Sequence, residues 1–214
     1  MVGIFSIAMA YLESAVVVYL RQIYGIKDLL TDLPTRPDRF TLIETGREIC
    51  TLAMLAAIGW LAGHRWQGKI GYALIAFGVW DIFYYVWLRI FIGWPTSLTD
   101  WDILFLLPLP WWGPVYSPIV IASLMIIWGV IFVVRANNNI IVRFPVYYWT
   151  LLCFSLLLAL FVFMKDAVYA LPGGAEALWH VRPTVFDWPF FLLSMAGIVF
   201  LTFKIARDKP KSRL

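Results

Sequence analysis

The sequence predicts an all-α integral membrane protein, a polytopic bundle of six transmembrane helices that forms a single domain over residues 1–214. Hydrophobic residues make up 62% of the chain and charged residues only 14%, against about 25% charged residues in an ordinary soluble domain. The mean hydropathy is +0.81. Several apolar runs reach the roughly 20 residues that a helix needs to cross a bilayer.

Six apolar segments of spanning length follow one another along the chain. Trp, Tyr and Pro lie near many of their ends, as expected for residues at a membrane interface. No basic residue precedes the first segment, so we expect a retained transmembrane helix there and not a cleaved signal peptide. The predicted spans are 3–24, 40–63, 70–93, 115–135, 144–164 and 187–206.

Charges outside the spans divide unequally between the two sides of the membrane. One side carries nine basic residues and one acid, the other five basic residues and eight acids. Because basic loops stay in the cytoplasm, we expect the inner (plasma) membrane, with both termini cytoplasmic. The basic residues are spread over short loops and a tail, which argues against nucleic-acid binding. The nine are Arg65, Lys69, Arg135, Arg143, Lys204, Arg207, Lys209, Lys211 and Arg213.

The segment 93–118 on the opposite, outer side contains five prolines and several tryptophans. Its apolar piece is too short to span, and the prolines would break a continuing helix. We therefore expect a re-entrant or surface-lying segment that covers the outer face, where irregular backbone must be shielded by protein or water.

Asp81, near the centre of the third span, is the residue that the membrane tolerates least. A charged side chain there costs about 3 kcal/mol on insertion scales, so Asp81 should face other helices and be paired or protonated. The tripeptide Trp-Asp-Ile that contains it recurs once, at 101–103.

Candidate partners lie in the first three spans. Glu44, Arg47 and Glu48 are spaced i, i+3, i+4 and share one face of the second span, where Arg47 can bridge both acids. Asp81 and Arg89 lie about 12 Å apart along the third span, so a tyrosine hydroxyl is the expected bridge between them. The other candidates are Glu13, Arg21, Tyr84 and Tyr85.

Together these spans hold four carboxylates and three guanidinium groups, a net charge of −1. One interpretation is a structural ion-pair network that holds three helices together. The other is a binding site, in which a cation or a proton supplies the missing positive charge. The last three spans carry no charge at depth.

A divalent metal is possible among the cofactors, held by oxygen ligands alone. Glu48, Asp81 and Glu13 would supply these ligands, with Asp102 or His180 reaching them from the outer loops. Such a site suits Mg, Mn or Ca. No span contains a histidine, which excludes haem held by paired in-span histidines, and there is no nucleotide-binding motif.

The sequence therefore predicts binding, and by extension transport, of a small charged ligand or cation in the outer half of the first three helices. One alternative is a membrane-embedded enzyme with an oxygen-ligated metal. Another is an accessory subunit of a larger membrane complex, whose ion pairs are structural and whose neighbour is another membrane protein or a second copy. The lipid bilayer surrounds the protein in all three cases.

Overall fold

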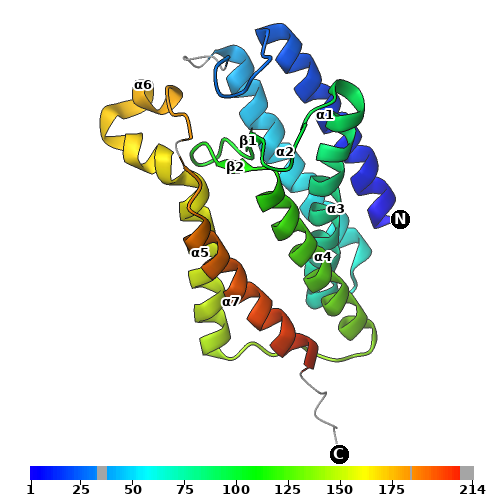
Figure 1. The fold of residues 1–214 in the computed structure, drawn as a ribbon. Coiled ribbons are helices and arrows are strands. Elements are labelled where there is room, and N and C mark those ends of the chain that lie inside the picture. Colours follow the sequence, from blue (N-terminus) through cyan, green and yellow to red (C-terminus); the bar gives the residue numbers. More distant parts are fainter. Residues whose placement is uncertain (33–37, 184, 208–214) are drawn as a thin grey trace, which may run out of the picture.

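The computed structural model describes residues 1–32, 38–183 and 185–207, which are mostly helical. Seven α-helices, one 3-10 helix and two short strands run through these described residues (Figure 1). In chain order they are α1 (Val2–Tyr24), α2 (Arg39–Ala62), α3 (Trp66–Ile92), β1 (Trp101–Ile103), β2 (Trp112–Pro114), α4 (Tyr116–Asn137), α5 (Val146–Ala170), η1 (Leu171–Gly173), α6 (Gly174–Trp179) and α7 (Trp188–Arg207).

Five segments of the described chain are long and apolar enough to cross a membrane, judged by length and composition. They are α1, α3, α4, the segment Val146–Gly173 that contains α5, and α7. The helix α2 has 24 residues but does not belong to this set, and it carries Glu44, Arg47 and Glu48. The fold is thus compatible with the predicted all-α membrane bundle, and the count of six spans depends on α2.

The chain between α3 and α4 forms a β-hairpin, which the prediction of an all-α fold did not include. The strands β1 and β2 pair in antiparallel register, with Asp102 opposite Gly113. Two further backbone hydrogen bonds continue the hairpin, from the Leu104 N–H to the Trp111 carbonyl (2.9 Å) and from the Trp111 N–H to the Phe105 carbonyl (2.8 Å). The position of this segment relative to a membrane stays a prediction.

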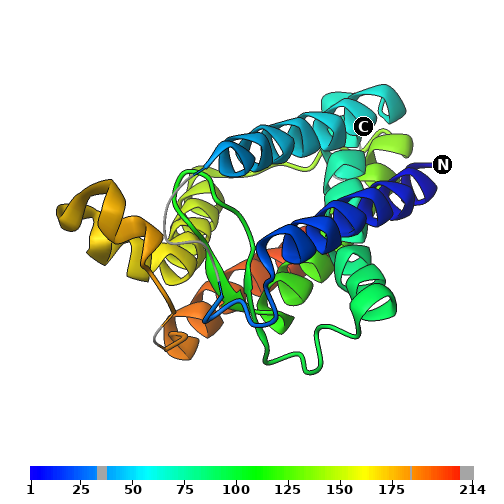
Figure 2. The ribbon, with the colours of Figure 1, turned by 90° about the horizontal axis from the view of Figure 1, so that it is seen from above.

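The helices form two units that are joined along α4 and α7. One unit is α1–α4, in which α3 packs most extensively on α4 and also on α1 and α2. The other is α5–α7, in which α5 packs on α7. Figures 1 and 2 show α5, α6 and α7 to one side of α1, α2 and α3. Contacts between the two units are few by comparison.

The contact between α3 and α4 is unusually close because three glycines lie in it. A Cβ atom at Gly71 would lie 2.8 Å from the Gly129 carbonyl oxygen, and one at Gly129 would lie 2.5 Å from the Gly71 carbonyl oxygen. A Cβ atom at Gly78 would lie 2.4 Å from the Ala122 carbonyl oxygen. Small residues of this kind let two membrane helices approach to backbone contact.

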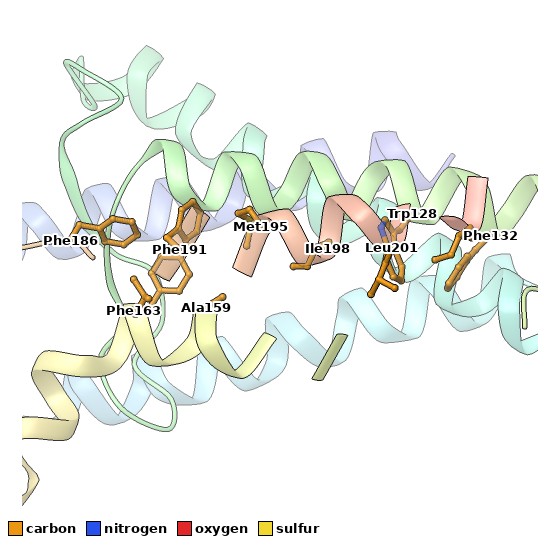
Figure 3. Close-up of a cluster of buried hydrophobic side chains, with 11 residues drawn as sticks. Trp128, Phe132, Ala159, Phe163, Phe186, Phe191, Met195, Ile198 and Leu201 are labelled. Atoms are coloured by element: carbon orange, nitrogen blue, oxygen red, sulfur yellow. The ribbon is translucent and has the colours of Figure 1, made fainter. Parts of the chain in front are cut away.

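The largest apolar core lies between the units. Figure 3 shows Phe191, Met195, Ile198 and Leu201 along one face of α7, with aromatic and aliphatic side chains of α5 and α4 around them. A smaller cluster joins the other helices, with Met9 and Ala10 of α1, Leu55 of α2, and Ala76 and Trp80 of α3.

The two ends of the bundle differ in their connections. The described residues 25–32, 93–115 and 171–183 lie at one end, which we call the hairpin end (Figure 1). The short connections 63–65 and 138–145 lie at the other, which we call the short-loop end. Many large apolar side chains point outward between these ends, such as Leu42, Leu61 and Phe203. Such a surface is suited to lipid and unsuited to water.

Candidate functional site

A cavity of about 200 Å³ opens at the hairpin end, inside the α1–α4 unit. Its walls come from α1 and the segment after it, α2, α3, the hairpin segment, and four residues at and after the end of α6, Leu178, Trp179, Val181 and Arg182. Eight of the nine ligand-binding candidates from the sequence line it, and Arg89 is the exception. The eight are Glu13, Arg21, Glu44, Arg47, Glu48, Asp81, Tyr84 and Tyr85.

Residues at the helix ends determine where the helices that form these walls begin and end. Gly25 and Gly93, with φ of 68° and 71°, end α1 and α3 in the left-handed conformation that favours glycine. Asp38 starts α2 as its N-cap, where its carboxylate accepts a hydrogen bond from the Thr41 N–H at 2.9 Å. The end of α1 and the start of α2 lie at the cavity, which Tyr24, Ile26 and Phe40 help to line.

Arg47 is the centre of an ion-pair cluster on one wall. Its guanidinium pairs with Glu44 on the same helix and with Glu13 on α1. The Thr51 hydroxyl donates a hydrogen bond to Glu13 at 3.1 Å. The bridge from Arg47 to Glu44 agrees with the helical spacing, whereas Arg47 makes its second ion pair with Glu13 and not with Glu48. The cluster ties α1 to α2 across the cavity wall.

Glu48 is buried, 6% exposed, and turns toward the hairpin segment. Both of its carboxylate oxygens accept the Leu106 backbone N–H, at 2.9 and 3.1 Å. A backbone donor between the strands would otherwise be unpaired in the protein interior. Glu48 therefore fastens the segment that covers the cavity to α2.

Asp102 on β1 is the second aspartate of the cavity and is only 3% exposed. It accepts a hydrogen bond from the Tyr85 hydroxyl at 3.1 Å. Burial raises the pKa of Asp102 to about 6, although the charge of Arg21 and the Tyr85 hydrogen bond oppose that shift. Tyr85 thus connects α3 to the hairpin and does not bridge Asp81 to Arg89.

Asp81 lies on α3, is half-buried and lines the cavity. It makes no hydrogen bond and no ion pair with any residue in the described ranges. The ionisable groups whose charges act on it are Asp102 and Glu13, both acidic. Asp81 is therefore the cavity carboxylate with neither a hydrogen bond nor an ion pair among the described residues, whereas Glu48 and Asp102 each accept a hydrogen bond.

Arg21 differs from Arg47 although both line the cavity. Its guanidinium lies over the ring of Trp94, with the carbon Cζ 4.0 Å from the ring centroid. Its Nε and Nη2 atoms are buried and have no hydrogen-bond partner among the described residues. The same holds for the indole Nε1 atoms of Trp80 and Trp112, two residues that also line the cavity.

Two predicted site residues lie outside the cavity. Arg89 is exposed and donates to the backbone carbonyls of Gly93 and Pro95, the latter at 2.8 Å, so it caps the end of α3. His180 is exposed and its Nδ1 lies 2.8 Å from the Glu176 carbonyl oxygen. Within the described part of the chain, no three His, Cys, Asp or Glu side chains are grouped so as to hold a metal ion.

Sequence reasoning missed the tryptophans of the cavity, Trp80 and Trp112, and the backbone of Leu106. Asp102 was considered only as a metal ligand. The repeated Trp-Asp-Ile at 80–82 and 101–103 is a signal for Trp80 and Asp102, because each copy places its aspartate on the cavity, but it does not include Trp112 or Leu106.

At the mouth of the cavity, the two units of the molecule meet. Arg182 donates from Nε to the Leu30 carbonyl oxygen at 3.1 Å and from Nη1 to the carbonyl oxygens of Trp179 (3.2 Å) and Val181 (2.9 Å). These contacts join the segment after α6 to the segment after α1.

Comparison with protein-family models, curated proteins and solved structures finds no match to this chain.

Proposed function

We propose that this protein lies in the inner membrane with six spans and cytoplasmic termini, and binds a small charged ligand or cation in the cavity at its hairpin end. Transport of that ligand is the natural extension of binding. The observation that carries the proposal is Asp81. Its carboxylate lines a cavity, and the charged groups that act on it are acidic. No described residue forms a hydrogen bond or an ion pair with it.

The contrast with Arg47 supports a binding role for Asp81. A purely structural network would pair an acid that lies near the middle of a predicted span, because an unpaired charge in a low-dielectric interior is strongly unfavourable. The acids around Arg47 are paired or hydrogen-bonded, yet Asp81 is left out. Ionisable residues inside a membrane that lack a structural partner are expected to serve a ligand, an ion or a proton.

The burial pattern of α2 supports its role as the sixth span. Its acid Glu48 is buried and Arg47 is engaged in ion pairs, so these charges turn inward. Its outward face instead carries large apolar side chains, Leu42, Ile43, Ile49, Leu52, Met54, Trp60 and Leu61. A helix with this arrangement presents an apolar surface to lipid although its overall composition is less apolar.

The test is cation binding by the purified protein and its Asp81→Asn variant in mild detergent. Sodium, ammonium and methylammonium salts are titrated at constant ionic strength, and binding is measured by calorimetry and by the shift in thermal unfolding. We expect a cation to bind the wild-type protein and to lose about 10- to 100-fold in affinity in Asp81→Asn. Glu176→Gln, which removes an exposed acid outside the cavity, is the matched control.

Asp81→Asn should fold as the wild type does, because the amide keeps the shape of the side chain and removes an unpaired charge. Equal cation affinity in wild type and Asp81→Asn would overturn the assignment of the site. Loss of folding in Asp81→Asn would show that Asp81 has a structural role instead.

A role as an accessory subunit has one observation in its favour. A second hollow of about 860 Å³ lies between α3 and α4 on one side and α5 and α7 on the other, toward the short-loop end. Its walls are almost entirely apolar, as in a surface that lipid or a neighbouring helix covers. Co-purification of a stoichiometric membrane protein in mild detergent would favour this role over ligand binding.

A further inference from the structure

Several residues that line the cavity carry buried hydrogen-bond donors that have no acceptor among the described residues. They are the Nε and Nη2 groups of Arg21 and the indole N–H groups of Trp80 and Trp112. Both indoles belong to well-buried side chains, 4% and 3% exposed. Leaving a buried donor unpaired costs about 1–3 kcal/mol, and more for a charged group. Several such donors around one cavity indicate that an acceptor belongs there.

Arg21 is held in a way that suits an anion. Its guanidinium lies over the ring of Trp94, and stacking on an aromatic ring leaves the N–H groups at the edge of the guanidinium plane for other partners. The charge of Arg21 acts on Asp102, but no hydrogen bond or ion pair joins them. Planar N–H pairs of this kind bind carboxylates in bidentate fashion.

The opposite requirement exists in the same cavity at Asp81. This carboxylate accepts no hydrogen bond from any described residue, and Asp102 and Glu13 give it only acidic neighbours. A cation alone would satisfy Asp81 and leave Arg21 and the two indoles unpaired. An anion alone would satisfy Arg21 and be repelled by Asp81. A ligand with one charge of each sign meets both requirements.

We propose that the cavity binds a small zwitterion, with its ammonium group at Asp81 and its carboxylate at Arg21 and the indole N–H groups of Trp80 and Trp112. This rests on the proposed function, since it keeps Asp81 as the cation site and adds the anion site. The volume of about 200 Å³ limits the ligand to a small molecule, because drug-sized ligands occupy cavities of roughly 300–1,000 Å³.

The experiment uses matched probes of increasing length against the full-length protein in mild detergent. The zwitterions are glycine, β-alanine and γ-aminobutyrate. Each has a matched amine (methylamine, ethylamine, propylamine) and a matched acid (acetate, propionate, butyrate). The series samples the separation between the two charged groups. Affinity is measured by calorimetry, and thermal unfolding confirms that each probe stabilises the folded protein.

We expect one zwitterion to bind at least about 10-fold more tightly than its amine and its acid, as a hydrogen bond to a charged group predicts. Arg21→Gln should lower the affinity for the zwitterion by about 10- to 100-fold and leave the affinity for the matched amine nearly unchanged. Asp81→Asn should weaken the zwitterion and the amine alike. Arg89→Gln, which alters an arginine outside the cavity, should bind all probes as the wild type does.

The outcomes separate this inference from the proposed function. Amines that bind as tightly as zwitterions, with no effect of Arg21→Gln, would overturn the zwitterion and leave the Asp81 cation site standing. If the matched acids bind more tightly than the zwitterions and the amines, and Asp81→Asn does not change the affinities, both the zwitterion and the Asp81 cation site are overturned. If no zwitterion binds at 100 mM while a simple cation does, the inference fails alone.

Discussion

The cavity at the hairpin end and the hollow toward the short-loop end are built on the same helix, α3, and are chemically opposite. The cavity is lined by five acids and three arginines. The larger hollow has Arg65 and Gln67 as its polar side chains of consequence, among many aliphatic and aromatic ones. One helix therefore changes from an apolar wall to a charged wall along its length.

The difference shows how the molecule separates two tasks. In the apolar hollow, packing depends on shape, and no charge has to be neutralised. In the cavity, charges have to be compensated, and Arg47 and Glu48 obtain partners from other elements, from α1 and from the hairpin segment. Substitutions of charged residues at the cavity and of residues in the apolar region should therefore change the stability of the protein by different amounts.

Arg47→Ala should give the largest effect, because it leaves Glu13 and Glu44 without their cation inside the protein. Breaking a buried ion pair from one side costs about 3–5 kcal/mol, so the free energy of unfolding should fall by that order. Chemical denaturation in mild detergent measures it. Arg65→Ala, at an exposed arginine beside the apolar hollow, is the control and should change stability by less than about 0.5 kcal/mol.

A combined variant sharpens this comparison. Glu13→Gln and Glu44→Gln together with Arg47→Met remove the charges on both sides, and should recover much of the lost stability. If Arg47→Ala is silent, the cluster does not hold α1 to α2.

Asp102 should make stability depend on pH. Its folded pKa is about 6, above its ordinary value of 3.8, so the folded protein holds the proton more tightly than the unfolded chain. The resulting stabilisation is complete below about pH 4 and is lost as pH rises through 6, on the order of 2–3 kcal/mol. Asp102→Asn should abolish this part of the pH dependence. If the difference in the free energy of unfolding between the wild type and Asp102→Asn stays constant from pH 4 to 7, the prediction is contradicted.

Gly129→Ala should disturb the apolar contact between α3 and α4. The new Cβ atom would lie 2.5 Å from the Gly71 carbonyl oxygen, so the helices must separate, at a cost of about 1–3 kcal/mol. Gly46→Ala is the matched control, since no atom lies within 4 Å of its Cβ position, and it should be neutral or slightly stabilising. Equal unfolding temperatures for the two variants would show that the close contact does not form.

Gln67→Leu should have the smallest effect, about 1 kcal/mol. Gln67 donates to the carbonyl oxygens of Phe132 (3.1 Å) and Ile140 (3.2 Å), and its Oε1 accepts the Val142 N–H at 2.8 Å. Amide hydrogen exchange at Val142 should accelerate in the variant, while exchange at Leu106 near the cavity should not change. Faster exchange at both amides would mean that the two ends are not independent.

The long helices could be predicted from the sequence because their signal is local. Apolar runs of spanning length, and glycines such as Gly25 and Gly93 at their ends, mark each helix without knowledge of its neighbours. The spacing of Glu44 and Arg47 likewise fixed one ion pair in advance. Residues that meet within a single helix are within the reach of this reasoning.

The rest of the fold and of the candidate site could not be predicted in this way, because it depends on contacts between segments that are far apart in the sequence. The hairpin strands have three residues each, too short to show an alternating pattern. The pairing of Arg47 with Glu13, of Glu48 with the Leu106 N–H, and of Tyr85 with Asp102 all join separate elements. Arg89 was misplaced because distance along a helix axis does not tell which way a side chain turns.

The cavity mouth has a consequence for communication through the molecule. Trp179, Val181 and Arg182 belong to the α5–α7 unit, yet they line a cavity of the α1–α4 unit, and Arg182 donates a hydrogen bond to the Leu30 carbonyl oxygen. Any change in the angle between the units therefore changes the aperture of the cavity. By thermodynamic reciprocity, a ligand that draws this rim inward favours one interunit angle.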